Sequence, residues 1–470
     1  MAQLTYYRSI QQDNPHYSLV NICLYATLIF IPMKRLATLG WLGLPVELTL
    51  AKLFILLTLL VWVFQLLYTK DSSFLSSPFK RILNTAIILY LFAACLSLLN
   101  ATEPFAGIAP VARRLIVILI YYLIINIVRD NKSLRISIIA LIIGNIPNIL
   151  GGIYELISHQ PIIDNRLLIS QDEDAGVENS IAAFGGYIRV QSFLLDPDIF
   201  AYFTILIMGL VLASLFSTFF FRSKLIYTLL VLLVTMHIIN VFAASSRAGW
   251  LGLFGCLVTF FLFMRIKYKA LLLAGITVIT IILFTGLALL SETPILSRLM
   301  GESGHHSISQ REEDAKLGMT TFKSAPILGV GMGNVEIVRH RFFKTVPGYL
   351  EKPWIKYFTN GYIQILAECG LIGLCCYLLI VISFIMMMVK VIRHSTNRGQ
   401  MTLALGILAS FSGHLIMLIA YNLHDSEIVW ILTGFGMALY TINEKETSST
   451  INQKTPPSWV GTILYPQKEK

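Results

Sequence analysis

Long apolar stretches separated by shorter polar ones run along almost the whole chain. A helix of about 20 apolar residues can cross a bilayer, and we count roughly twelve stretches that approach this length. Their approximate bounds are 19–33, 46–68, 83–99, 115–128, 136–154, 200–221, 225–244, 249–264, 270–290, 361–389, 401–421 and 427–442. The pattern therefore predicts an all-α integral membrane protein with about twelve transmembrane helices.

Two longer polar segments divide the predicted helices into three groups. The units are N-terminal helices (1–154), an acidic loop (155–199), central helices (200–290), a large loop (291–357), C-terminal helices (358–442) and a polar tail (443–470). Long loops in a compact protein are usually functional or disordered. The large loop contains helix-like stretches at 311–324 and 334–345, so we predict that it is ordered. The tail is polar and contains prolines, which predicts disorder.

Composition supports this class of protein. The 470 residues are 56% hydrophobic and 13% charged, with a mean hydropathy of +0.72. A soluble domain carries about 25% charged residues, so a soluble enzyme is excluded. The net charge of +10 is no sign of nucleic-acid binding, because the basic residues lie in short loops between apolar stretches. All six cysteines fall in apolar stretches, which predicts packing and not a disulfide framework or a metal site.

The distribution of basic residues predicts the orientation. The short loops with most Lys and Arg are 69–82, 129–135, 222–224, 265–269 and 390–398. Basic loops stay in the cytoplasm, so we place these loops and both termini there. The acidic loop and the large loop then lie outside.

Several arginines remain on the predicted outer side, although insertion disfavours positive charge there. They are Arg113, Arg114, Arg189, Arg247 and Arg311. Taken singly, each can reach a lipid headgroup or pair with a local carboxylate. Taken together they predict a site for an anion, because guanidinium groups bind phosphate bidentately and stay charged when partly buried. A diphosphate carried on a lipid suits such a site.

The stretch YFTNGYIQILAECGLIG at 357–373 begins a predicted helix with polar residues. Thr359 can cap this helix while Asn360 binds a sugar hydroxyl. Gln364 and Glu368 follow at helical spacing, and a carboxylate near hydrocarbon is costly without a partner. Two interpretations stay open. Glu368 either pairs with an arginine or a backbone donor inside the bundle, or it takes part in a proton relay through Gln364.

Three shorter motifs carry weaker signals. The sequence DPD at 196–198 predicts a helix start with Asp196 as the N-terminal cap. The sequence GVGMGN at 329–334 is not a dinucleotide fingerprint, and it predicts a plain connector or a tight turn whose N–H groups face an anion. The triplet DED at 172–174 is similar to a metal-binding motif of sugar transferases, but a solvated acidic loop is favoured, and we predict no metal.

From about residue 185 to 440 the chain resembles the O-antigen ligase and polymerase superfamily of bacterial envelope glycan assembly. The matching stretches are RVQSFLLDPDIFAYF, SSRAGW, SQREEDAKLGMTTFKSAPILGVGMGN, YFTNGYIQILAECGLIG and YNLHDSEIVWILTGFG. The family pattern has His-Asn followed by two spaced glycines. Asn360, Gly370 and Gly373 match this pattern, whereas Thr359 stands where the family has histidine.

The resemblance implies a bundle like that of lipid-dependent glycosyltransferases in the bacterial cytoplasmic membrane, with its active site facing outside. It implies a glycan donor on undecaprenyl diphosphate, transfer to an acceptor hydroxyl with inversion, and no required metal or other cofactor. The arginines Arg189, Arg247 and Arg311 would stabilise the diphosphate leaving group, with Arg113 and Arg114 as further candidates. A chain-length regulator or another assembly protein is a further expected partner, and nucleic acid is not.

The missing histidine leaves the general base open, because threonine cannot act as a base at neutral pH. Our candidates are Glu368, His340, His424 and Asp425. The predicted residues for the acceptor or sugar are Thr359, Asn360, Gln364 and Trp354. The same substitution favours a polymerase of lipid-linked repeat units over a ligase to lipid A-core or another acceptor.

Two other classes remain. A flippase for lipid-linked oligosaccharides would place charges along a cavity inside many spans, whereas Glu47, Lys52 and Glu368 are the main charges in these spans. A non-catalytic assembly subunit would keep the scaffold after losing the base.

Overall fold

The computed structural model describes residues 15–33, 50–69, 78–162, 189–194, 196–217, 223–264, 302–342 and 357–454. Within these residues the secondary structure is helical. The helices are α2 (Pro15–Phe30), α3 (Leu50–Thr69), α4 (Pro78–Ser97), α5 (Ile108–Ile127), α6 (Asn131–Ser158), α8 (Pro197–Phe216), α9 (Lys224–Ala243), α10 (Arg247–Phe263), α13 (Glu302–Ser324), α14 (Val335–Phe342), α15 (Gly361–His394), α16 (Arg398–Met417) and α17 (Glu427–Lys454). Short 3₁₀ turns are η1 (Ile31–Met33), η3 (Leu98–Asn100), η4 (Pro104–Gly107) and η6 (Ser192–Leu194).

Each predicted span inside the described residues coincides with a helix, and the predicted span at 270–290 lies outside them. By length and composition, 7 of the described helices can cross a membrane, and three shorter ones are also apolar. The structure therefore supports an integral membrane protein. It does not confirm the predicted count of twelve spans.

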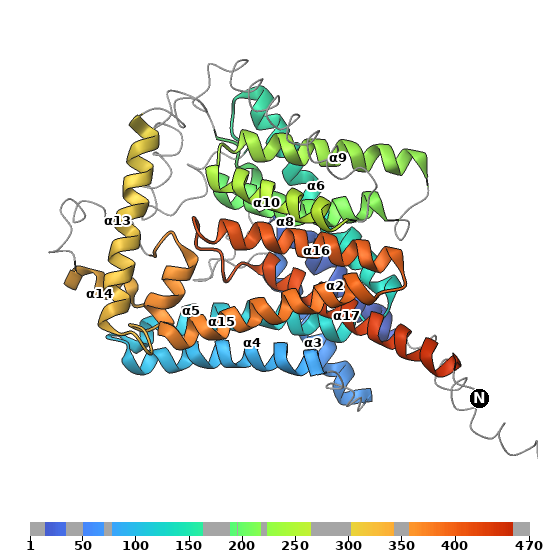
Figure 1. Cartoon of the computed structure of the whole chain (residues 1–470), viewed down its shortest axis with the longest axis horizontal. Coiled ribbons are helices and arrows are strands. Elements are labelled where there is room, and N and C mark those ends of the chain that lie inside the picture. The colour runs from blue at the N-terminus through green and yellow to red at the C-terminus, as the bar shows by residue number, and fades with distance from the viewer. Residues whose placement is uncertain are drawn as a thin grey trace, which may run out of the picture.

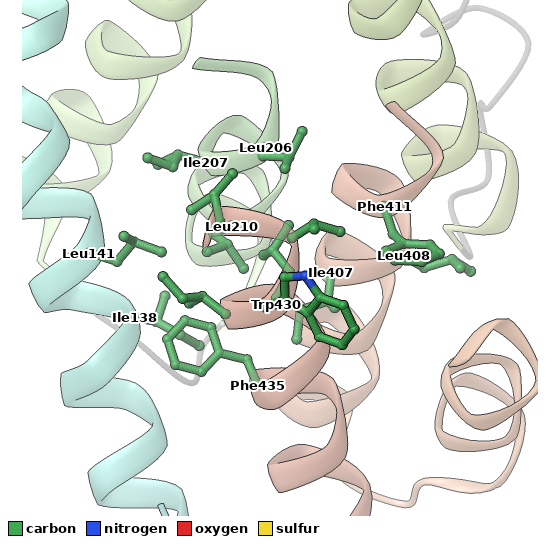
Figure 2. Close-up of a cluster of buried hydrophobic side chains, with 14 of the residues drawn as sticks. Ile138, Leu141, Leu206, Ile207, Leu210, Ile407, Leu408, Phe411, Trp430 and Phe435 are labelled. Carbon is green, nitrogen blue, oxygen red and sulfur yellow. The ribbon is translucent and has the colours of Figure 1, made fainter. Parts of the chain in front are cut away.

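The long helices lie side by side, and α13 crosses one end of the bundle (Figure 1). We call this end the α13 end, and we call residues 302–342 the crossing segment. Helix α8 lies at the centre, and 83% of an apolar 18-residue stretch of this helix is buried inside the protein. It packs against α6, α9, α10 and α16. Figure 2 shows the resulting core, in which side chains of α6, α8, α16 and α17 meet around Trp430 and Phe435.

Glycines let the central helices approach closely, as is common between helices in lipid. A Cβ on Gly406 of α16 would overlap the backbone oxygen of Gly209 of α8. In contrast, many large apolar side chains on α3, α9 and α10 are exposed. This distribution fits a bundle whose outer faces contact lipid.

Helix α15 is interrupted at Gly370, whose φ is 64°. The crossing segment fills this break through its backbone. The N–H of Val330 donates to the Ala367 oxygen at 2.9 Å, and the N–H of Leu371 donates to the Pro326 oxygen at 2.9 Å. A Cβ at Gly370 would overlap the backbone of Ile327. The break therefore joins the crossing segment to α15 and satisfies polar groups that the interruption frees.

The long polar regions differ in part from expectation. The helix-like stretches of the large loop correspond to α13 and α14, as predicted. The tail prediction needs correction, because α17 continues as a helix to Lys454. Polar contacts support this extension: Asn443 donates to Gln400 at 2.8 Å, and Glu446 accepts from Gln400 and from Asn131. Asp172–Asp174 lie outside the described residues.

Candidate functional site

Three of the predicted anion-binding arginines meet at the α13 end, on three separate elements. Arg189 precedes α8, Arg247 is the first residue of α10, and Arg311 lies on α13. Arg189 donates to the Ala244 oxygen at 3.1 Å and pairs with Asp198 at 3.4 Å. Arg247 lies within electrostatic reach of both Arg311 and Asp198. We call Arg189, Arg247, Arg311 and Asp198 the arginine cluster.

Like charges gathered in this way disfavour one another and favour an anion. Electrostatic repulsion from Arg311 acts on Arg247, and attraction to Asp198 offsets part of it. The side chains of Arg189, Arg247 and Arg311 are partly exposed, so a ligand can reach them. Such a cluster can bind a diphosphate with charge-assisted hydrogen bonds.

A buried carboxylate that the sequence analysis did not consider positions Arg189. Glu155 at the end of α6 is 2% exposed. It accepts hydrogen bonds from the backbone N–H groups of Gln191 and Ser192, both at 2.8 Å, and from that of Ile162 at 3.1 Å. The available signal was an acidic residue directly after an apolar stretch. Glu155 thereby fixes the segment that carries Arg189 against α6.

Asp196 caps α8, as the DPD motif predicted. Its Oδ1 atom accepts from the N–H groups of Asp198 at 2.7 Å and Ile199 at 2.9 Å. Its Oδ2 atom accepts from the hydroxyl of Tyr421 at 2.6 Å. Burial and the neighbouring Asp198 carboxylate raise the pKa of Asp196, and the hydrogen bond from Tyr421 opposes this rise.

The loop between α16 and α17 (residues 418–426) lies beside the polar start of α15. The N–H of Gly361 donates to the Leu418 oxygen at 2.9 Å, and Tyr357 is within electrostatic reach of Tyr421. Thr359 lies between these two contacts in the chain. The position where the family has histidine therefore lies next to the 418–426 loop.

Asn360, and not Thr359, caps α15. Its Oδ1 atom accepts from the N–H groups of Tyr362 at 2.9 Å and Ile363 at 3.1 Å. The expectation that Thr359 caps this helix is therefore wrong by one residue. The reason is that the helix begins at Gly361, so the residue before it takes the cap position.

A second charged cluster surrounds Arg114, whose side chain is fully buried. Its Nε atom donates to Oδ1 of Asp425 at 2.9 Å, and its Nη2 atom donates to Oδ2 of Asp425 at 2.9 Å and to Nε2 of His424 at 2.8 Å. The guanidinium also stacks over the Tyr90 ring at 4.4 Å. Because guanidinium only donates, Nε2 of His424 accepts, which assigns the ring proton to Nδ1 facing Asn422 Oδ1 at 2.7 Å.

The electrostatics of this cluster keep Asp425 ionised. Burial raises the pKa of Asp425, but the charge of Arg114 and its hydrogen bonds outweigh this effect and hold the pKa well below its usual range. Arg114 is occupied by these partners and does not join the arginine cluster. Arg113, the residue before Arg114 in α5, is exposed.

Glu368 lies within electrostatic reach of the Arg114 cluster, and a backbone N–H of the crossing segment donates a hydrogen bond to its carboxylate. It is 6% exposed and accepts from the N–H of Gly333 at 2.9 Å. Arg114 lies within electrostatic reach. Gln364 accepts from the N–H of Phe358 at 2.7 Å, so its side-chain oxygen serves the backbone and not Glu368. These contacts match the interpretation in which a backbone donor satisfies Glu368, and the anion that the GVGMGN turn faces is this carboxylate.

The side chain of His340 and the whole of Trp354 lie outside the described residues.

A buried histidine that was not predicted lies below the 418–426 loop. His414 contacts the hydroxyls of Tyr202 and Tyr377, both at 2.9 Å. Its only signal was a histidine within an apolar stretch, and it joins α8, α15 and α16.

Comparison with known proteins gives one family match. Residues 229–378 match a family model described as O-antigen ligase. The match covers about a third of the chain, and it includes Arg247, Arg311 and the start of α15. Arg189 and the 418–426 loop lie outside it. No curated protein matches the chain.

Proposed function

We propose that this chain, a member of the O-antigen ligase and polymerase superfamily by its match over residues 229–378, polymerises lipid-linked glycan repeat units. The donor glycan would be carried on undecaprenyl diphosphate at the outer face of the cytoplasmic membrane. The observation that carries this proposal is the meeting of Arg189, Arg247 and Arg311 from three separate elements.

The positive charge of the arginine cluster suits a reaction in which a diphosphate leaves with negative charge. An acceptor sugar hydroxyl attacks the anomeric carbon of the donor as the bond from that carbon to the diphosphate oxygen breaks. The electron pair leaves with the diphosphate, and the configuration at carbon inverts. Positive groups fixed where charge develops lower the barrier, which is the role of the arginine cluster. Because these guanidinium groups supply positive charge, the proposed step needs no metal.

A ligase is the second candidate, because the matching family model is described as O-antigen ligase. Thr359 in place of histidine supports the polymerase instead. The two activities differ in their acceptor. A polymerase produces ladders of repeat units on the lipid carrier, whereas a ligase moves one finished glycan to another lipid or protein.

The buried charges argue against a flippase. Among the described residues, the buried Asp, Glu and Arg side chains are Arg114, Glu155, Asp314 and Glu368. Arg114 and Glu368 belong to one cluster, Glu155 binds the segment that carries Arg189, and Asp314 lies on α13. A path for a charged lipid through the membrane would need charged groups along several spans.

Reconstitution tests the proposal. Purified protein in proteoliposomes is given a lipid-linked repeat unit with a chelator of divalent metals, and the products are separated by size. We expect ladders of repeat units from wild type. R247A and R311A should lower the rate by ~10²–10³-fold, which is the usual effect of removing one stabilising donor. R393A, an exposed arginine in the last turn of α15, serves as the control. Wild-type rates in R247A and R311A would refute the proposal.

A further inference from the structure

We propose that Asp196 is the proton acceptor of the transfer reaction and that Tyr421 passes the proton to it. This inference rests on the proposed function and supplies the general base that Thr359 cannot provide. Asp196 is the N-terminal cap of α8, and Tyr421 lies in the loop between α16 and α17.

Of the four predicted bases, the three whose side chains the structure describes are poorly suited to the task. Asp425 is held by Arg114 through several hydrogen bonds, and the Nε2 lone pair of His424 also faces Arg114. Glu368 accepts from the Gly333 backbone. His424 and Glu368 are buried, so neither is open to a sugar hydroxyl.

The Asp196–Tyr421 pair is better placed. Both residues are partly exposed, and their oxygens are 2.6 Å apart, the short distance of a hydrogen bond between a hydroxyl and a carboxylate. Asp198, two residues after Asp196, belongs to the arginine cluster through its contact with Arg189. The pair therefore lies at the edge of the proposed diphosphate site.

The pair also lies next to the position of the missing histidine. Tyr357 is within electrostatic reach of Tyr421, and Gly361 donates to Leu418. Thr359 lies midway between Tyr357 and Gly361, so the segment 357–361 runs along the loop that presents Tyr421. A hydroxyl bound near Thr359 would therefore lie beside the loop that carries Tyr421.

The electrostatics suit these roles. Burial raises the pKa of Tyr421 well above its usual value, so it keeps its proton at neutral pH and donates to Asp196. Burial and Asp198 raise the pKa of Asp196, which makes its carboxylate a stronger base than an exposed one.

The step balances. The proton of the acceptor hydroxyl moves to the phenol oxygen of Tyr421 as the proton of Tyr421 moves to Oδ2 of Asp196. The acceptor oxygen forms its bond to the anomeric carbon, and the diphosphate leaves with the electron pair. Tyr421 ends the step with a proton, and Asp196 ends it neutral and later releases its proton to water.

The test uses two conservative variants of the full chain. D196N keeps the helix cap, because asparagine is as good an N-cap as aspartate, but it removes the base. Y421F removes only the hydroxyl. The controls are D130N, which changes the capping aspartate of α6, and Y440F, which removes a hydroxyl near the other end of the bundle. Elongation is measured in proteoliposomes, and binding is measured with undecaprenyl diphosphate as the probe.

We expect D196N to slow elongation by ~10²–10⁴-fold, the usual contribution of a positioned base, while it binds undecaprenyl diphosphate as wild type does. Y421F should also slow elongation. It should move the acidic limb of the pH–rate profile to higher pH, because the Tyr421 hydrogen bond opposes the rise in the pKa of Asp196. Asp198 and Arg189, the other charged groups facing Asp196, are unchanged in this variant, and so is Tyr357 beside Tyr421.

The outcomes separate the inference from the proposed function. Full elongation by D196N, with loss of elongation in R247A, would overturn the base assignment and leave the proposed function standing. Equal losses in D196N and D130N would show that only the helix cap matters, and they would also overturn it. A wild-type protein that neither elongates glycan nor binds undecaprenyl diphosphate would refute the proposed function, and the inference would fall with it.

Discussion

Single residues at the α13 end have roles that depend on partners far away in the sequence. Arg114 was predicted to bind diphosphate, but it is buried against Asp425 and His424. Glu368 was a candidate base, and a backbone N–H of the crossing segment satisfies it. A charged residue in an apolar stretch thus indicates that it has a partner. Packing decides which residue that partner is.

Replacing Asp425 should destabilise the protein. D425N would leave Arg114 buried without its charge partner, and breaking a buried ion pair costs about 3–5 kcal/mol. We expect a value near the lower end, because the Asp425 side chain is 19% exposed. Thermal unfolding in detergent measures the change. E312Q, which alters an exposed pair with Lys316, should unfold like wild type. An unchanged unfolding temperature for D425N would contradict this account.

Acid should weaken the same contact. The folded-state pKa of Asp425 lies below its unfolded value, so its stabilising contribution is fully present above the unfolded pKa. The contribution is lost as pH falls below about 4 toward the folded pKa. The difference in unfolding temperature between wild type and D425N should therefore shrink in this range. A difference that stayed constant down to pH 2 would show that the charge of Asp425 is not its source.

At the scale of elements, the apolar pattern predicted helices well because burial and lipid contact both require long apolar runs. It did not predict the interruption of α15, because Gly370 lies inside such a run. Nor did it predict that the turn at 329–334 fills this interruption, because pairing between two backbones leaves little trace in side-chain type. The glycines Gly329 and Gly370 were the available signal, and both have positive φ.

Replacing Gly370 with alanine should weaken the backbone pairing between α15 and the crossing segment. The backbone conformation there strongly favours glycine, and forcing it on alanine costs about 1–3 kcal/mol before any overlap is counted. Overlap of the new Cβ with Ile327 adds to this cost. We expect G370A to unfold at lower temperature and to be cleaved faster by protease within the crossing segment. L371A changes an exposed neighbour and is the matched control. Equal protease resistance in G370A and L371A would argue that this backbone pairing does not depend on Gly370.

For the molecule as a whole, the proposed site is assembled from segments between residues 189 and 425. The resemblance indicated the arginine cluster because three quoted motifs each carried one of its arginines. Asp196 was expected only to cap a helix, and Glu155 was not considered. Their roles arise where loops from opposite parts of the chain meet, which a local pattern does not encode. The orientation in the membrane remains a prediction from loop charge.

Cysteine labelling tests this orientation. In a variant without the native cysteines, E312C on α13 should react in intact cells with a maleimide that cannot cross the membrane. R393C at the end of α15 should react only after the cells are opened. Both residues are exposed, so a difference in labelling reports the side of the membrane. Labelling of R393C in intact cells would reverse the predicted orientation.

The backbone pairing at Gly370 has a consequence for the proposed polymerisation. Because main-chain hydrogen bonds tie the crossing segment to α15, we expect these two elements to move together. A product leaving the proposed site would then have to move along this paired surface unless these backbone hydrogen bonds break. If the chain polymerises glycan as proposed, we therefore expect the release of long products, more than bond formation, to limit the rate.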